Sequence, residues 1–220
     1  VRKNTKILLS VLAEIEKRNY RGNILIVSNP VDILTRVAQR HSALPEERIF
    51  GSGTVLDTAR LKYLLGEHLS VDSRSVHAFI IGEHGDSEIP VWSSANVSGV
   101  PLHDFCEMRG YYDHDNAMLE IGESVKNSAY AIIERKGATY YGIAMAVLRI
   151  CEAVVRDEKS ILPVSAALHG EFGIEGATLS VPAILGKNGV EKIVPISLSE
   201  SELTRLRYSA DMLKSVFEDL

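Results

Sequence analysis

The sequence has no long apolar segment, because charged residues interrupt each apolar run well before the roughly 20 residues that a membrane-spanning helix needs. It opens with the polar residues 1–6 and shows no signal peptide. Basic residues are not in excess, since Lys and Arg total 24 against 29 Asp and Glu, a net charge of −5. These absences argue against a membrane partner, against secretion and against nucleic acid as a main partner, so we expect a cytoplasmic location.

Cysteine is equally scarce, with only Cys106 and Cys151 present. Two isolated cysteines do not suggest a disulfide framework or a cysteine-based metal site. The seven histidines lack the spacing of zinc motifs, so we predict no metal. The remaining composition, 45% apolar and 24% charged, is that of an ordinary globular protein that can bury a large core in one domain or two.

The first 50 residues alternate predicted helices and short apolar strands. Apolar residues at helical spacing predict an amphipathic helix over 4–19, and the β-branched run at 23–28 predicts a strand buried on both faces. A helix follows Pro30, and residues 48–50 are a second short strand. Helices and strands that alternate with short connections are typical of a parallel α/β sheet.

The rest of the chain has a different pattern. Gly51-Ser52-Gly53 predicts a sharp turn with Thr54 as a helix cap, and the third glycine of a dinucleotide fingerprint is missing there. Further helices are predicted at 55–69, 115–135 and 140–156, with strands at 75–81, 91–98, 160–168, 177–185 and 190–196. The last three strands form an antiparallel meander, and Ser199 with Glu202 predicts a capping box for a final helix. We therefore predict an α/β fold that continues into an α+β part.

His84 is the first candidate for chemistry. It lies in a polar loop between Gly82 and Gly85, just after an apolar strand, and an imidazole can transfer a proton near neutral pH. The alternative is a partly buried histidine that bonds to the backbone, which is the commoner situation for an arbitrary histidine.

Asp57 and Arg60 are three residues apart and share one face of the predicted helix. Spacing alone favours an exposed intrahelical ion pair. In the functional alternative, Asp57 orients and stabilises a protonated His84, and Arg60 binds a substrate carboxylate through two parallel contacts. Asn29 lies at the carboxyl end of a predicted parallel strand, where ligands bind in open α/β sheets, although a simple turn explains it equally well.

Read together, five segments resemble the L-lactate dehydrogenases of the lactate/malate dehydrogenase family. They are 27–32 (VSNPVD), 51–60 (GSGTVLDTAR), 81–88 (IGEHGDSE), 136–142 (KGATYYG) and 179–182 (LSVP) with 187–189 (KNG). The resemblance implies the reversible NADH-dependent reduction of pyruvate to L-lactate, a reaction of glycolysis and fermentation. It implies that His84 gives and takes the proton, that Asp57 is its partner, and that Arg60 binds the substrate carboxylate.

The resemblance also implies binding residues for NAD and substrate. Asn29 would contact both the nicotinamide side and the substrate oxygen, and Thr139 would line the substrate pocket. The other expected cofactor contacts are Val27, Ser28, Ser10 and Ser52. Malate dehydrogenase and a non-catalytic oligomerising fragment are the alternatives, and Thr139 with its neighbours favours lactate.

Family members form homotetramers, and many bacterial members bind fructose 1,6-bisphosphate between subunits through an arginine and a histidine. The corresponding positions here are Lys62 and His77. A lysine attracts phosphate as a point charge without the two-point geometry of arginine. The simpler alternative is that Lys62 is a solvated helix residue and His77 an ordinary strand residue.

The resemblance divides the chain into a partial Rossmann-type dinucleotide-binding domain over 1–50 and an α+β catalytic domain over 51–220. The Gly-rich phosphate turn, the ribose-binding acid and the loop with a catalytic arginine that family members carry cannot be placed in the sequence. Because a pyrophosphate then lacks its backbone cradle, we expect this chain by itself to bind NADH weakly and to turn over slowly.

Overall fold

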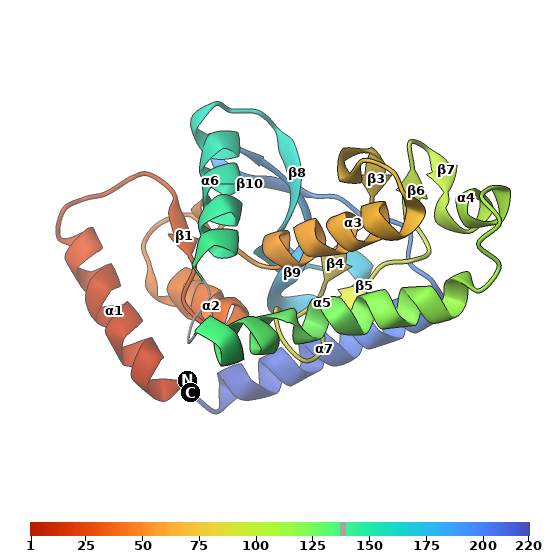
Figure 1. Cartoon of the computed structure of the whole chain (residues 1–220). Coiled ribbons are helices and arrows are strands. Elements are labelled where there is room, and N and C mark those ends of the chain that lie inside the picture. The colour runs from red at the N-terminus through yellow and green to blue at the C-terminus, as the bar shows by residue number, and fades with distance from the viewer. Residues whose placement is uncertain (137–139) are drawn as a thin grey trace.

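The computed structural model describes residues 1–136 and 140–220, apart from the side chains of residues 129–133, 135 and 136. No helix in that part of the chain is long and apolar enough to cross a membrane. The helices, shown in Figure 1, are α1 (Arg2–Glu16), α2 (Val31–His41), α3 (Val55–Leu69), α4 (Leu102–Met108), α5 (His114–Lys136), α6 (Tyr141–Val155) and α7 (Glu200–Glu218), with short 3-10 helices η1 (Glu46–Arg48), η2 (Ser73–Ser75) and η3 (Glu171–Gly173). The strands are β1 (Ile24–Ile26), β2 (Ile49–Gly51), β3 (Val76–His77), β4 (Ile80–Ile81), β5 (Ile89–Pro90), β6 (Asn96–Val97), β7 (Val100–Pro101), β8 (Ser160–His169), β9 (Glu175–Gly186) and β10 (Gly189–Ile193).

A five-stranded mixed sheet in the order β1-β2-β8-β9-β10 forms the centre of the fold. β1 and β2 are parallel, with Ile24 opposite Ile49, and β8, β9 and β10 form an antiparallel meander. Gly51 of β2 pairs with Ser165 of β8 and so joins the parallel strands to the meander. These findings confirm the predicted α/β class. The sheet crosses the boundary predicted at residue 51, and the division into two domains stays a prediction.

The N-terminal elements follow the prediction, but the first strand is less buried than expected. The structure gives α1 the bounds Arg2–Glu16, slightly before the predicted 4–19. β1 is the edge strand of the sheet, so Ile24 and Leu25 are only partly buried and Ile26 is buried. The prediction of a strand buried on both faces was therefore wrong for β1. It describes β9 instead, in which residues 177–183 are all buried.

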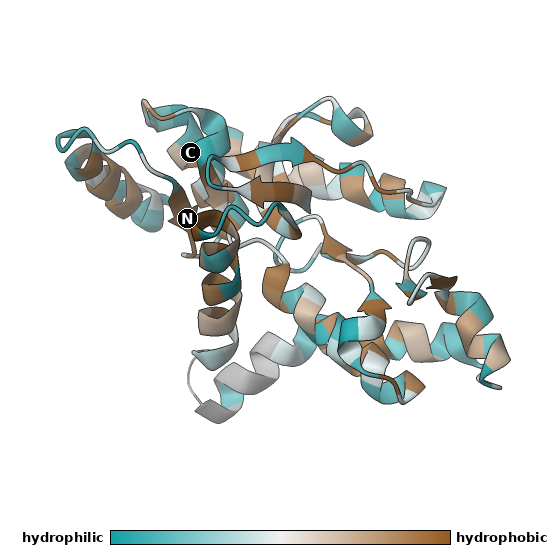
Figure 2. Cartoon of the chain, turned by 90° about the horizontal axis from the view of Figure 1, so that it is seen from above, coloured by the Kyte–Doolittle hydropathy of each residue, from teal (hydrophilic) through white to brown (hydrophobic). Residues whose placement is uncertain are grey.

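The largest core surrounds the meander, because α2, α6 and α7 all contact β9. Its members come from both ends of the chain, for example Phe50 of β2, Leu179 of β9 and Leu206 of α7. Figure 2 shows hydrophobic residues in strands near the middle of the molecule and mixed residues on the surrounding helices. A second core lies between α3, α4 and α5 and includes Leu61 and Leu65.

Two strand predictions were wrong in detail. The run at 75–81 is divided into β3 and β4, because β3 pairs with β6 while β4 pairs with β5 in a separate sheet. Of the predicted strand at 91–98 only β6 forms, since residues 91–95 are the connection between β5 and β6, and α4 was not predicted. The predicted capping box of Ser199 and Glu202 at the start of α7 is confirmed.

Gly53 brings the start of α3 against the sheet. Its φ is +52°, and a Cβ placed on it would lie 2.6 Å from the backbone nitrogen of Ser165 and 2.7 Å from the carbonyl oxygen of Pro163. The next residue, Thr54, donates its backbone N–H to Pro163 at 3.1 Å. The Thr54 hydroxyl does not cap α3 as predicted, because it donates to the Ile80 carbonyl at 2.5 Å. These contacts fix the first turn of α3 between β8 and β4.

We predict that Gly53→Ala lowers the free energy of unfolding by about 3 kcal/mol, because the new methyl group collides with backbone atoms at a left-handed φ. Gly176→Ala is the matched control, since Gly176 also has a positive φ, +69°, but a Cβ added there would meet no atom within 4 Å. It should cost about 1 kcal/mol. Urea unfolding of both variants measures the difference, and equal losses would contradict the role given to Gly53.

Candidate active site

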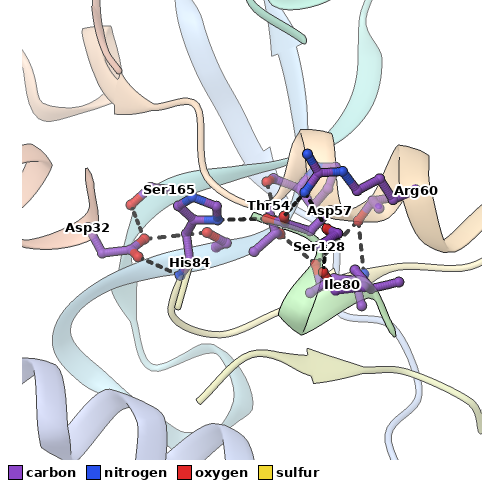
Figure 3. Close-up of polar contacts among 12 residues, drawn as sticks. Asp32, Thr54, Asp57, Arg60, Ile80, His84, Ser128 and Ser165 are labelled. Carbon is purple, nitrogen blue, oxygen red and sulfur yellow. Dashed lines mark hydrogen bonds and ion pairs between the residues drawn. The ribbon is translucent and has the colours of Figure 1, made fainter. Parts of the chain in front are cut away.

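His84 and Asp57 are in direct contact. The Nδ1 atom of His84 lies 2.6 Å from the Oδ2 atom of Asp57, which as a carboxylate oxygen accepts the hydrogen bond (Figure 3). Asp57 is in the first turn of α3 and is 4% exposed, whereas the His84 side chain, in the loop after β4, is 28% exposed. Because Nδ1 is bonded to Asp57, the other ring nitrogen, Nε2, is left to face a ligand.

The environment of His84 favours its protonated form. Burial by itself lowers the pKa of the imidazole, but the hydrogen bond and negative charge of Asp57 outweigh it, and Asp32 and Glu88 add to the attraction. Together they raise the pKa of His84 to about 9. His84 is therefore largely protonated at neutral pH.

Three consecutive backbone N–H groups hold the loop that carries His84. Gly82 donates to the Ser180 carbonyl of β9 at 2.8 Å, and Glu83 donates to the Ser209 hydroxyl of α7 at 2.9 Å. His84 itself donates to the Asp32 carboxylate of α2 at 2.8 Å. The loop is thus attached to a strand and two helices, which fixes the direction of the imidazole.

Asp32 is the central acceptor of this arrangement. It lies in the first turn of α2, just after the cis Asn29–Pro30 bond, and is 2% exposed. Besides His84, it accepts hydrogen bonds from the hydroxyls of Ser165 at 2.6 Å and Ser180 at 3.3 Å. Burial raises the pKa of Asp32 to about 6, although the bond from Ser165 opposes the shift. The sheet and α2 therefore meet at the carboxylate that orients His84.

Arg60 lies next to the acid–base pair. Its Nη1 atom is 3.9 Å from Asp57 and donates a hydrogen bond to the Ser128 hydroxyl of α5 at 2.6 Å. The side chain of Arg60 is 19% exposed and that of Asp57 is 5% exposed. The exposed ion pair that spacing alone favoured is therefore wrong, because α3 turns this face toward α5 and the His84 loop.

Glu88 adds a third ionisable group to His84 and Asp57. One polar side-chain atom from each of the three residues lies within 4.8 Å of those of the other two. Glu88 is 6% exposed, and burial, followed by the charge of Asp57, raises the pKa of its carboxyl to about 8. The sequence analysis did not single out this residue.

The other predicted site residues lie away from the His84–Asp57 pair or outside the residues that the structure describes. Val27, Ser28 and Asn29 are exposed at the carboxyl end of β1, and Ser52 is buried just after β2, at the same edge of the parallel pair. Ser10 is exposed on α1 and donates to the Ile7 carbonyl at 2.7 Å. The hydrogen bonds of the described residues do not join Asn29 to His84, Asp57 or Arg60, and Thr139 lies outside the described residues.

The exposed edge of β1 fits a dinucleotide cofactor. Asn29 presents a side-chain amide that is not engaged in a hydrogen bond within the described part of the chain, and an amide can donate and accept at once. Its backbone carbonyl accepts from Asn4 at 2.8 Å, which holds this segment to α1. Val27, Ser28 and Asn29 would hold the nicotinamide half of such a cofactor at the strand edge where α/β sheets bind ligands.

The site combines a half-buried imidazole, its buried carboxylate partner and an arginine on an α/β sheet with an exposed strand edge. These features define the class of an acid–base enzyme for an anionic substrate. The NAD-binding domain of lactate/malate dehydrogenases matches residues 1–51, and the alpha/beta C-terminal domain of the same family matches residues 54–220. The chain belongs to the lactate/malate dehydrogenase family, whose cofactor is NAD.

Three proteins that are similar to this chain are named L-lactate dehydrogenase. The L-lactate dehydrogenase of Acetivibrio thermocellus is 48% identical over 220 residues, which cover 100% of this chain and 69% of the relative. The L-lactate dehydrogenase of Kosmotoga olearia is 49% identical over 223 residues, which again cover 100% of this chain and 69% of the relative. The ligand-bound crystal structure of the minor L-lactate dehydrogenase from Enterococcus mundtii superposes with a TM-score of 0.93 at 41% identity, over 99% of this chain and 69% of that one.

Sequence reasoning missed three residues that shape the site: Asp32, Glu88 and Ser128. Asp32 has the signature of an ordinary acidic residue in the first turn of a helix. Glu88 follows His84 by four residues in a polar loop, and Ser128 lies in a long amphipathic helix. Their placement beside His84 and Arg60 comes from contacts between distant segments, for which the local sequence gives no signal.

We predict that Asp32→Ala lowers the free energy of unfolding by about 3 kcal/mol, because it leaves two buried hydroxyls and the His84 N–H without their acceptor. Asp32→Asn is the matched control, since it keeps one acceptor oxygen and nearly the same volume, and it should lose less than half as much. Urea unfolding measures both values. Equal losses in the two variants would show that the acceptor atoms do not matter.

Proposed function

We propose that the protein catalyses the reversible NADH-dependent reduction of pyruvate to L-lactate. The observation that carries this proposal is the hydrogen bond between His84 and Asp57, which lies beside Arg60. The loop that holds His84 is attached to α2, α7 and β9. Relatives named L-lactate dehydrogenase, at 45% to 49% identity, support the choice of substrate. Reduction of pyruvate by NADH is a reaction of fermentation and glycolysis, so we place the protein in the cytoplasm.

Each site residue has one task in this reaction. Arg60 binds the substrate carboxylate through its guanidinium, and Asn29 contacts the nicotinamide side and the substrate oxygen, with Thr139 lining the pocket. NADH, when bound at Val27, Ser28, Asn29, Ser10 and Ser52, supplies the hydride. His84 donates its Nε2 proton to the substrate oxygen, on which negative charge develops, and Asp57 stabilises the imidazolium before the transfer. In the reverse direction, neutral His84 takes the proton from the hydroxyl group.

Oxaloacetate is the alternative substrate, because malate dehydrogenases belong to the same family. Its second carboxylate would bring another negative charge into a site that already holds the buried carboxylate of Asp57. Pyruvate carries only the carboxylate that Arg60 binds. The charges around His84 therefore favour the substrate with one carboxylate.

We predict that the full-length protein oxidises NADH with pyruvate far faster than with oxaloacetate, as followed by NADH absorbance. His84→Gln should lower kcat by about 1,000-fold, since it removes the proton donor. Arg60→Lys should raise the KM for pyruvate by about 10- to 100-fold, because a lysine cannot make the two-point contact. His103→Gln is the control: the His103 side chain is 61% exposed, and its loss should change neither constant.

The pH dependence tests the direction of proton transfer. His84 has a raised pKa of about 9, so it is protonated below that pH and neutral above it. Pyruvate reduction should therefore fall as the pH rises through about 9, whereas lactate oxidation should rise. Preference for oxaloacetate, or full activity of His84→Gln, would contradict the proposal.

A specific observation favours a second, regulatory site. Lys62 and His77 line one pocket of about 560 Å³, together with Arg74 and Arg149. Arg74 is paired with Asp72 at 2.6 Å and Arg149 with Glu158 at 2.5 Å. Within the described residues Lys62 has no acidic partner, and burial lowers its pKa. We infer that Lys62 and His77 bind a phosphate group of fructose 1,6-bisphosphate.

We also propose that the protein assembles as a homotetramer. Helix α6 exposes apolar side chains that a neighbouring subunit would cover; they are Tyr141, Met145, Leu148 and Val155. Such a contiguous apolar face is typical of an interface between subunits.

We predict that fructose 1,6-bisphosphate lowers the KM for pyruvate and that Lys62→Gln abolishes this effect, because the variant removes the unpaired charge from the pocket. Lys192→Gln, at a lysine that does not line that pocket, should respond like the unaltered protein. Initial rates with and without the sugar bisphosphate provide the measurement. Activation that persists in Lys62→Gln would contradict the assignment.

A further inference from the structure

Glu88 is a buried carboxyl that the reaction described above does not use. Its side chain is 6% exposed and faces the His84–Asp57 pair, with polar atoms of the three residues within 4.8 Å of one another. Its Oε1 atom is fully buried and makes no hydrogen bond within the described part of the chain. Burying a carboxyl oxygen without a hydrogen-bond partner costs free energy, so this position of Glu88 lowers the stability of the fold.

The backbone around Glu88 fixes the carboxyl in place. Its N–H donates to the Gly85 carbonyl at 3.2 Å, which closes the loop that begins at His84. Its carbonyl accepts a hydrogen bond from Arg205 of α7 at 3.2 Å. The backbone of Glu88 is therefore held through both its N–H and its carbonyl, which fixes the position from which its side chain extends toward His84.

Charged groups face Glu88 from several elements, but none pairs with it. The groups are Asp57 and Arg60 from α3, His84 from its own loop, Lys126 and Glu123 from α5, and Arg205 from α7. In the described part of the chain no cationic nitrogen lies within 4.0 Å of the Glu88 carboxyl oxygens. Asp32 from α2 also acts on the charge of His84, and Glu83 lies close enough to Asp32 to affect its charge.

We propose that Glu88 is a positioning residue for proton transfer, whose carboxylate holds the proton on His84 and whose protonated form admits the substrate carboxylate to Arg60. The proposal rests on the function proposed above. An ionised Glu88 places a second negative charge beside the imidazolium, in addition to Asp57, and so opposes loss of its proton. The same charge repels an anionic substrate, whereas a neutral Glu88 leaves the positive charge of Arg60 available.

The ionisation range of Glu88 agrees with this role. Burial raises the pKa of its carboxyl to about 8, and the pKa of His84 is raised to about 9 despite burial. Near neutral pH the carboxyl is protonated and the substrate site is favourable for an anion. As the pH rises through about 8, Glu88 ionises first and delays the loss of the His84 proton, at the expense of substrate binding.

The test is a titration of the His84 imidazole by NMR in the full-length protein, with the signal assigned by its absence in His84→Gln. In Glu88→Gln the midpoint should fall by about 1 pH unit relative to the unaltered protein, since the variant keeps the shape and removes the charge. Glu123→Gln is the matched control, because Glu123 is an exposed acid at the same small pocket as Glu88. Its midpoint should not change.

Glu88→Asp separates charge from packing. It keeps the carboxylate in a shorter side chain, so its midpoint should stay near that of the unaltered protein, and it also serves if Glu88→Gln fails to fold. Equal shifts in Glu88→Asp and Glu88→Gln, or an unchanged midpoint in Glu88→Gln, would overturn the proposal.

Kinetics provides the second readout. The alkaline limb of kcat for pyruvate, which reports the loss of the His84 proton, should move to lower pH in Glu88→Gln, and the rise of KM above pH 8 should become smaller. If the unaltered protein does not reduce pyruvate at all, the proposed function fails, but the NMR midpoints still decide whether Glu88 acts on His84. Identical pH profiles in an active protein would overturn the role of Glu88 alone.

Discussion

The contact between His84 and Asp57 is the interaction on which the site depends, because a buried carboxylate and a half-buried imidazole each need a partner of opposite charge. The two side chains reach the same place from different elements. Asp57 comes from the first turn of α3, which Gly53 brings against β8 through a backbone approach that no side chain would allow. His84 comes from the loop after β4. The packing of α3 on the sheet therefore decides whether the pair can form.

Precise placement of His84 also requires that its loop does not move. Loops are ordinarily the more mobile parts of a protein, yet this one is attached through consecutive N–H groups to β9, α7 and α2. Asp32 is the key acceptor because it binds the loop, Ser165 and Ser180 at once. A site held in this way does not have to reorganise when charge develops on the substrate.

Burial gives the acidic residues of the site different tasks. Asp32 has a pKa raised to about 6 and works as a hydrogen-bond acceptor, whereas Glu88 has a pKa raised to about 8 and is neutral near pH 7. Asp57 stays next to the imidazolium and supports its charge. Carboxyl groups of similar intrinsic acidity thus differ in protonation because their surroundings differ. The positive charges of His84 and Arg60 therefore lie among the acidic residues Asp32, Asp57 and Glu88.

The sequence by itself determined the class of the fold and the chemical character of the central residues. Helical spacing defined α3 and α7, an Asn-Gly turn defined the meander, and glycines marked the loop around His84, because periodicity and turn chemistry act locally. The tertiary structure alone decided that Asp57 is buried against His84 instead of paired on the surface, that β1 is an edge strand, and that Asp32, Glu88 and Ser128 join the site. These outcomes depend on which distant segments pack together. Desolvation and pairing across such contacts change the energy of a charged group by several kcal/mol, about ten times what its neighbours in sequence contribute.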